Sequence, residues 1–341
     1  MLQPRWLNKL SLFPINTARN VATDARLVGK LQQILASQQS YFSGQTFLHK
    51  TLGYRGVVLF GCKVPFFDRN KDDRPNSKPG ANTFTYKPLH IVKRGDKDTT
   101  RHASFTSIGS QPELRLIYQV LANPLDVREE IKSENLTYLH INNSPLVSVE
   151  GIDYVSHDDV IPYKNMDSDP FKHFLFDSLM SVDFNHIYTA KDLLYAWKKR
   201  NEHWVKNCSV HRQLTQGVRI TVTPFYIGYD SSSRGQKGFH YWRYTIRIEN
   251  FNLYSVQLRE RNWKILSSMG ALETVKGRGV VGEEPVLDSL RPVFQYNSNT
   301  SLQSKSGFMF GTFKFEKLDG RMFDVIIPPF PLEVPIVTES S

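Results

Sequence analysis

The segment Gly277–Gly282 has residue types and a spacing that could bind phosphate. It reads Gly-Arg-Gly-Val-Val-Gly and matches the G-x-G-x-x-G pattern with which dinucleotide-binding proteins hold a pyrophosphate. That chemistry needs a strand before the loop and a helix directly after it. Here Glu283 and Glu284 follow, whose carboxylates would repel phosphate, and Pro285 disfavours helical geometry at the residue before it. We therefore predict a turn between two strands rather than a cofactor site, with weak anion affinity at most. The candidate anion-binding residues are Gly277, Arg278, Gly279 and Gly282.

Other catalytic signals are weak. The sequence contains no G-x-S-x-G elbow, no H-E-x-x-H and no P-loop. The triplet His157-Asp158-Asp159 could act as a metal or acid–base cluster, but its three side chains occupy successive positions after an expected strand, which favours a polar loop. Cys62 and Cys208 have no neighbours at metal-ligand spacing. We predict a protein that is not an enzyme and that holds no metal or cofactor.

Two groups of charged residues are candidate partner contacts. Alternation along Tyr241–Glu249 places Arg243 and Arg247 on one face of a strand and an apolar, aromatic set on the other. The arginine face could bind phosphate or an acidic partner.

The second group is Arg259-Glu260-Arg261. It separates two short apolar segments, so we expect a charged turn on a loop. Such a cluster is either a set of solvated ion pairs, each contributing little energy, or a polar contact with a partner.

Length and composition set the limits for the fold. A chain of 341 residues exceeds one ordinary domain, and 40% apolar residues are enough to build cores. No apolar stretch approaches the roughly 20 residues of a membrane span. The net charge of +10 suits a polyanionic partner, but the basic residues are scattered, which fits a solvated basic surface equally well.

The N-terminal segment differs from the rest of the chain. Its first 38 residues contain five Lys and Arg residues and one acidic residue, Asp24, and lack a continuous apolar core. This composition is typical of a mitochondrial transit peptide. We expect residues 1–40 to be a transit peptide and linker that is cleaved before Tyr41.

Alternating patterns predict a small β-rich module over residues 41–165. A hairpin is expected from Gln45–His49 and Gly56–Phe60, and further strands near Leu116–Leu121, Thr137–Ile141 and Gly151–Val155. Residues 68–110 are rich in Gly, Pro, Asn and charge, so we expect a flexible loop there.

A helical connector is expected over residues 166–211. Apolar residues recur at helical spacing from Phe171 to Leu179, which predicts a first helix. Thr189 and Asp192 resemble a capping box before Leu193, Leu194 and Trp197, which predicts a second.

Residues 212–335 read as all-β, and residues 336–341 as a tail. Short alternating strands are separated by turn residues at intervals of about ten, which favours an antiparallel sandwich of immunoglobulin-like architecture. The expected strands include Val218–Thr223, Tyr241–Glu249, Val256–Arg259, Trp263–Leu266, Gly307–Phe315 and Met322–Ile327. The predicted fold class is therefore mainly β.

Several of these segments resemble known families. Tyr241–Asn250, Val256–Arg259, Gly277–Leu287 and Ser306–Phe313 resemble the ApaG-type domain, which implies a fibronectin-type β-sandwich. Less strongly, Gly44–Lys50, Gly53–Val58, Tyr118–Leu121 and Tyr154–Asp159 resemble the YccV-like module of hemimethylated-DNA-binding and protease-regulating proteins. The resemblance covers about residues 41 to 335, and the loop 68–110 departs from it.

The order of the two modules, behind a basic N-terminal segment, resembles a family of non-catalytic adaptor proteins. That resemblance implies a place in the mitochondrial matrix, with a further pool in the nucleus. It also implies partners: DNA polymerase subunits, the sliding clamp, a primase-polymerase and the matrix Clp protease unfoldase. The alternative function is a direct DNA-binding module of the hemimethylated-DNA-binding type, or a weaker nucleic-acid affinity.

Overall fold

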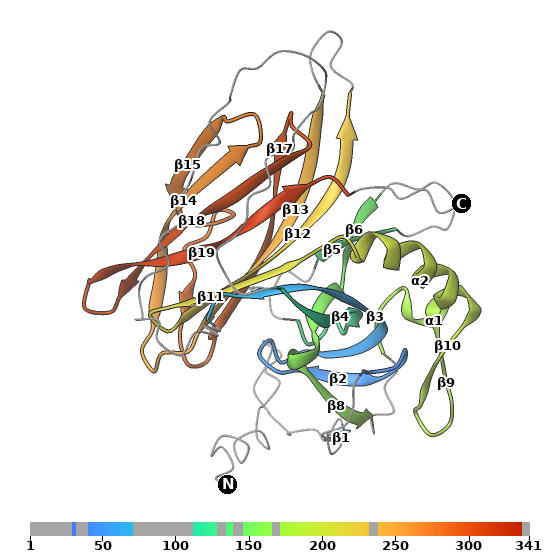
Figure 1. Ribbon diagram of the computed structural model, residues 1–341. Coiled ribbons are helices and arrows are strands. Elements are labelled where there is room, and N and C mark those ends of the chain that lie inside the picture. Colours follow the sequence, from blue (N-terminus) through green and yellow to red (C-terminus); the bar gives the residue numbers. More distant parts are fainter. Residues whose placement is uncertain are drawn as a thin grey trace, which may run out of the picture. The chain divides into compact units, whose positions relative to one another are not determined.

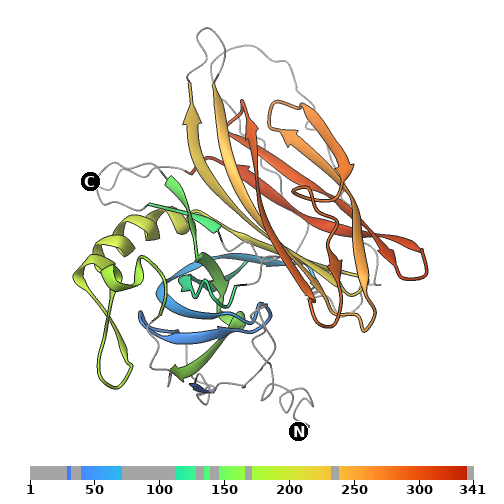
Figure 2. The same cartoon turned by 180° about the vertical axis from the view of Figure 1, so that it is seen from behind.

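The computed structural model describes residues 29–31, 40–70, 112–127, 134–138, 146–165, 171–231 and 238–335. Most of the expected transit peptide, most of the expected flexible loop and the tail lie outside these residues. The fold is mainly β, as predicted, with two α-helices in the described parts of the chain (Figures 1 and 2). Neither is long and apolar enough to cross a membrane.

The chain forms two compact units. The first takes in residues up to Gly61 and Leu116–Glu202, and the second takes in Cys62–Arg115 and His203–Ser341. The long strand β3 (Arg55–Asp68) therefore contributes its first half to one unit and its second half to the other. The predicted boundaries between the β module, the helical connector and the sandwich, at residues 165 and 211, remain predictions.

The first unit is built on a sheet in the order β1-β8-β2-β3-β4-β7. The predicted hairpin is confirmed, because Thr46 and Phe47 of one strand pair with Val57 and Gly56 of the next. Large apolar side chains that this sheet buries completely include Phe47, Tyr54 and Tyr118. The strand bounds are β1 (Gly29–Leu31), β2 (Thr46–His49), β4 (Glu113–Ala122), β7 (Ile152–Ser156) and β8 (Val160–Asn165), with a separate hairpin of β5 (Glu134–Tyr138) and β6 (Leu146–Glu150).

The expected helix from Phe171 to Leu179 is wrong over most of its length. Only one turn is helical, α1 (Phe176–Leu179), and the chain then forms the hairpin β9 (Met180–Val182) and β10 (Tyr188–Ala190). Phe174, which the helical spacing would bury, is 69% exposed, whereas Phe176, which lies outside that spacing, is buried and packs on Phe171 with ring centroids 5.1 Å apart.

The second expected helix is confirmed as α2 (Asp192–Val205), but its predicted cap is not. Thr189 belongs to β10, where its hydroxyl lies 2.6 Å from that of Ser181 across the hairpin.

A buried polar network attaches α2 to the strands of the first unit. The indole of Trp197 donates to Gln119 Oε1 at 2.7 Å, and the amide of Gln119 donates to the Tyr154 hydroxyl at 2.9 Å. Asn201 Oδ1 accepts from the Thr137 hydroxyl at 2.8 Å and from a strand amide at 2.9 Å. Asn201 is fully buried, and a buried polar group costs free energy unless it is paired. This network therefore fixes the position of the helix.

The second unit contains two sheets around one core. One sheet has the order β11-β12-β13-β17, with the end of β3 parallel to β11, and the other has the order β15-β14-β18-β19, with β16 beside β14. Side chains from both sheets form a single apolar cluster in which Trp263 contacts Tyr244, Phe313 and Phe330. The bounds are β11 (Val210–Thr215), β12 (Val218–Asp230), β13 (Phe239–Asn250), β14 (Val256–Ser267), β15 (Leu272–Arg278), β16 (Val286–Leu287), β17 (Val293–Leu302), β18 (Ser306–Lys317) and β19 (Met322–Glu333).

We predict that Asn201→Ala destabilises the first unit by about 2–3 kcal/mol, since it leaves the buried Thr137 hydroxyl and the part-buried Tyr138 amide without their acceptor. Urea titration monitored by tryptophan fluorescence would measure the change. Asn207→Ala is the control, because Asn207 is exposed and donates to one carbonyl only. Equal effects of the two variants would contradict this role of the network.

Candidate functional site

The glycine-rich segment is a turn between β15 and β16, as predicted. Val280 and Glu283 exchange both backbone hydrogen bonds at 2.8 Å, and Val281 and Gly282 between them have φ angles of 47° and 85°. Two central residues with positive φ form the tight turn that matches the twist of a two-stranded ribbon. No helix follows, so the segment lacks the geometry of a dinucleotide-binding loop.

The turn requires the backbone conformation of Gly279. Its φ is 55°, and its amide donates to the Arg259 carbonyl of β14 at 2.8 Å. A Cβ at this position would lie 2.2 Å from the Glu283 carbonyl oxygen, which no side chain can tolerate without movement of the backbone. The prediction that at least one glycine of this segment has positive φ is confirmed.

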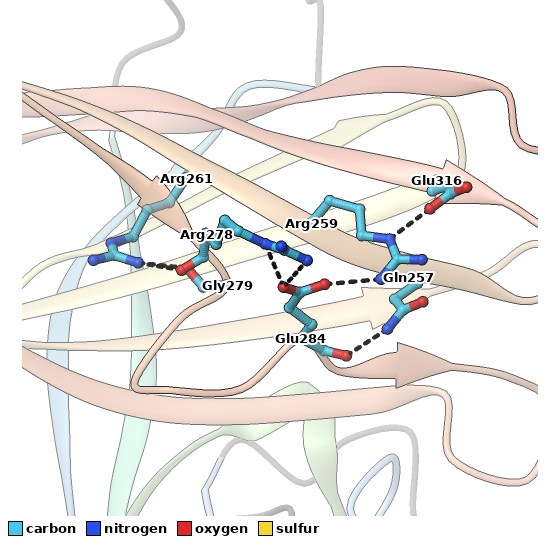
Figure 3. A network of polar contacts seen from close by, with 7 residues as sticks. All are labelled: Gln257, Arg259, Arg261, Arg278, Gly279, Glu284 and Glu316. Atoms are coloured by element: carbon cyan, nitrogen blue, oxygen red, sulfur yellow. Dashed lines mark hydrogen bonds and ion pairs between the residues drawn. The ribbon is translucent and has the colours of Figure 1, made fainter.

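The turn places Glu284 between two arginines (Figure 3). Its Oε2 accepts from Arg259 Nη1 at 2.8 Å, and its Oε1 accepts from Arg278 Nε at 2.9 Å. Arg259 also donates its Nε to Glu316 of β18, and Gln257 donates to the Glu284 carbonyl at 3.1 Å. We call these five residues, Gln257, Arg259, Arg278, Glu284 and Glu316, the turn network.

A β-bulge points Arg259 into this network. In the pairing of β14 with β18, Leu258 lies opposite Phe315 and Glu260 lies opposite Lys314, so Arg259 is the extra residue. A bulge re-aims a side chain and increases the local twist. The prediction of a loop at Arg259-Glu260-Arg261 is therefore wrong, because the three residues lie within the continuous strand β14.

Arg261 has a structural role beside the network. Its Nη1 donates to the carbonyls of Arg278 and Gly279, both at 2.7 Å. A Cβ on Gly277 would lie 3.0–3.1 Å from the Arg261 guanidinium, so the absence of a side chain there makes room for it. Glu260 points elsewhere and pairs with Lys314 at 3.3 Å.

The other arginine pair differs from its prediction. The alternation along β13 is confirmed, since Trp242, Tyr244 and their alternate neighbours are buried in the core. Arg247, however, was expected on an exposed face and is 8% exposed. The Nε of Arg247 donates to Gln295 of β17 at 2.9 Å, so Arg247 stabilises the pairing of two strands. Arg243 lies on the same face and is half-buried.

Sequence reasoning missed the central residue of the network. Glu284 was considered only as a group that repels phosphate, whereas it supplies the anion to Arg259 and Arg278 itself. Glu316 and Gln257 were missed as well, because their positions depend on the register of β14 with β18 and β16. No local sequence signal reports that register.

The arginines and glutamates of the turn network neutralise one another's charge. The hydrogen bond from Arg259, and then the charge of Arg278, lower the pKa of the Glu284 carboxyl. The same pairing raises the pKa of the Arg259 guanidinium. In this arrangement the arginines carry their own counterions, which disfavours tight binding of a further anion at the turn. Among the described residues, no group of three or more His, Cys, Asp or Glu could hold a metal ion.

We predict that Gly279→Ala lowers the stability of the second unit more than Gly282→Ala does. Both substitutions put alanine at positive φ, which costs about 1–2 kcal/mol. Only the Cβ at Gly279 also overlaps a carbonyl, whereas nothing lies within 4 Å of one at Gly282. Thermal unfolding of the two variants would measure the difference, and equal melting temperatures would contradict the steric role of Gly279.

We predict that Arg259→Gln raises the pKa of Glu284 towards the usual carboxyl value. Because the folded-state pKa is lowered, the stabilising contribution of this pairing is present at neutral pH and is lost as pH falls through the folded pKa. NMR titration of labelled glutamate carboxyls would follow Glu284 in both proteins. An unchanged titration in the variant would show that Arg259 does not hold this carboxylate.

The C-terminal half of the chain is similar to ApaG proteins. The model of the ApaG domain family matches residues 230–317. Protein ApaG of Paramagnetospirillum magneticum is 44% identical over 128 residues, which are 37% of this chain and 95% of that protein. An X-ray structure of a structural genomics target is 32% identical, with a TM-score of 0.34, and the match covers 38% of this chain and 96% of that one.

A longer similarity spans both units. Polymerase delta-interacting protein 2 of Mus musculus is 38% identical to this chain over 330 residues. The alignment covers 93% of this chain and 84% of the mouse protein. This chain belongs to the polymerase delta-interacting protein 2 family, with an ApaG domain in its C-terminal half.

Proposed function

We propose that this chain is a non-catalytic adaptor that docks DNA polymerase components. The observation that carries the proposal is the similarity over 93% of the chain to a protein whose name states that it interacts with polymerase delta.

The turn network and the strand beside it support a docking role. β15 pairs with β14 on one side only in the described part of the sheet, and such an edge can accept a peptide strand. At the end of this strand the Arg278 side chain is 80% exposed although it pairs with Glu284. A charge held in place by its own counterion is ordered before a partner arrives, so docking loses less side-chain entropy.

Val281 is the exposed apolar residue at the tip of the turn. It is 44% exposed at the tip of the turn and has a φ of 47°, which is unfavourable for a β-branched side chain. Strain of this kind is concentrated at functional positions. We take Val281 and Arg278 as the proposed contact pair.

We further propose that the protein works in the mitochondrial matrix, with a second pool in the nucleus. The five basic residues and one acid among the first 38 residues support import. Its proposed partners there are a primase-polymerase and the unfoldase of the matrix Clp protease, whose activity it would modulate, and in the nucleus the sliding clamp. At a finer level, we propose a fibronectin-type sandwich for the second unit and a YccV-like fold for the first.

We predict that Arg278→Glu weakens capture of purified polymerase delta by the full chain, because it reverses an exposed charge and places it beside Glu284. Arg321→Glu is the matched control: Arg321 is 76% exposed and likewise pairs with one carboxylate, Asp319. Val281→Gly should also weaken capture while raising thermal stability, since glycine adopts positive φ without strain.

The Arg278→Glu and Val281→Gly variants together distinguish a loss of docking from a loss of folding. Loss of capture in a variant that is more stable than wild type cannot be attributed to unfolding. Equal capture by all three variants would remove this turn from the proposal, and absence of capture by the wild type would remove the adaptor function itself.

Direct binding of DNA is the competing function, and the net charge of +10 favours it. A duplex-binding assay at increasing salt separates the two. An adaptor predicts weak binding that salt abolishes, whereas a DNA-binding module predicts affinity that depends on the methylation state of the duplex.

A further inference from the structure

Three turns at one end of the second unit carry exposed leucines at their tips. Leu253 is 103% exposed, Leu318 is 85% exposed and Leu290 is 79% exposed. Each belongs to a different connection: Leu253 lies between β13 and β14, Leu290 between β16 and β17, and Leu318 between β18 and β19. Single exposed leucines are normal, but three at the tips of adjacent turns form a patch that calls for an explanation.

Strand register and hydrogen bonds bring these turns to the same end of the unit. The amide of Asn250 donates to the Pro292 carbonyl at 2.8 Å, and its side chain donates to the carbonyls of Tyr254 and Leu287 at 2.9 and 3.0 Å. Val256 pairs with Lys317, which places the third turn beside the first. Both views show these strand ends in the same lower part of the unit, with the connection between β18 and β19 projecting beside the other two (Figures 1 and 2).

Aromatic and cationic groups lie just behind the leucines. Lys317 Nζ lies 5.0 Å from the centroid of the Tyr254 ring, and the Arg219 guanidinium lies 4.6 Å from that of Phe251. The two rings are themselves 41% and 54% exposed. Two ion pairs at this end, Asp319 with Arg321 and Glu249 with Arg219, neutralise both of their members. The Asp288 carboxylate accepts the amides of Leu290 and Arg291.

This order, from aliphatic tips through aromatic rings to basic side chains, follows the layers of a lipid interface. Tyrosine rings prefer the headgroup level, and basic side chains extend their charge towards anionic lipids while their stems stay in apolar surroundings. Some backbone amides of the turns have internal partners, among them those of Phe251, Asp288 and Gly320. A backbone group that is paired in this way enters an apolar layer at a lower cost than an unpaired one. The net charge of +10 adds a long-range attraction to a negative surface.

We propose that these turns insert shallowly into an anionic lipid bilayer and hold the protein at a membrane surface. A protein partner is the less favoured occupant, because hot spots of protein interfaces cluster in well-packed pockets and leucine is under-represented among them. The leucines here stand on separate convex turns. The inference is independent of the polymerase-docking proposal.

The test is flotation of the full chain with vesicles of phosphatidylcholine and phosphatidylglycerol in equal parts. The triple variant Leu253→Ser, Leu290→Ser, Leu318→Ser should bind roughly tenfold or more weakly, because it removes the apolar area that enters the bilayer. The matched control is Met269→Ser with Leu272→Ser. These residues are 69% and 58% exposed and lie at and beside the turn at the opposite end of β14.

A site-specific probe distinguishes insertion from electrostatic adsorption. Both native cysteines are buried, so Leu253→Cys can carry an environment-sensitive dye, with Leu272→Cys as the control. Vesicles should shift the emission of the dye at 253 to the blue and leave the dye at 272 unchanged. No flotation of the wild type, equal flotation of the triple variant, or an unchanged dye at 253 would each overturn the proposal. Loss of polymerase capture in the triple variant, without flotation of the wild type, would assign this end to a protein interface instead.

Discussion

The polar surface of the second unit depends on the backbone conformation of Gly279. The turn can bring Glu284 back towards β14 only if the chain reverses within four residues, and the Gly279 amide must meet the Arg259 carbonyl for this to happen. A side chain at 279 would overlap the Glu283 carbonyl. Without this reversal Glu284 would not lie between Arg259 and Arg278, and Arg261 would lose the two carbonyls to which it donates.

The turn network also depends on the bulge at Arg259. A regular ladder would place Arg259 directly opposite a residue of β18, whereas the bulge frees it to contact Glu284 and Glu316 together. The resulting surface is charged and internally neutralised. Such a surface is a poor site for a free phosphate but a well-ordered one for a protein, because its side chains are already fixed by one another.

Part of this architecture could be predicted from the sequence. The alternation along Tyr241–Glu249 predicted which side chains enter the core, and Pro285 with its acidic neighbours excluded a helix after the glycine-rich turn. The pairing of Glu284 with Arg259 could not be predicted, since it depends on strand register and on a one-residue bulge. Arg247 was assigned to solvent because alternation reports the face of a strand and not whether that face is buried. Here Arg247 is buried with Gln295, its cross-strand neighbour on β17.

We propose that a polymerase partner docks at the turn between β15 and β16 and along the edge of β15. Hydrogen–deuterium exchange of the full chain, with and without purified polymerase delta, tests it directly, because an edge strand that gains a partner gains protection at its free amides. We expect slower exchange over residues 272–284 in the complex. Unchanged exchange there, together with protection elsewhere in a complex that forms, would contradict it.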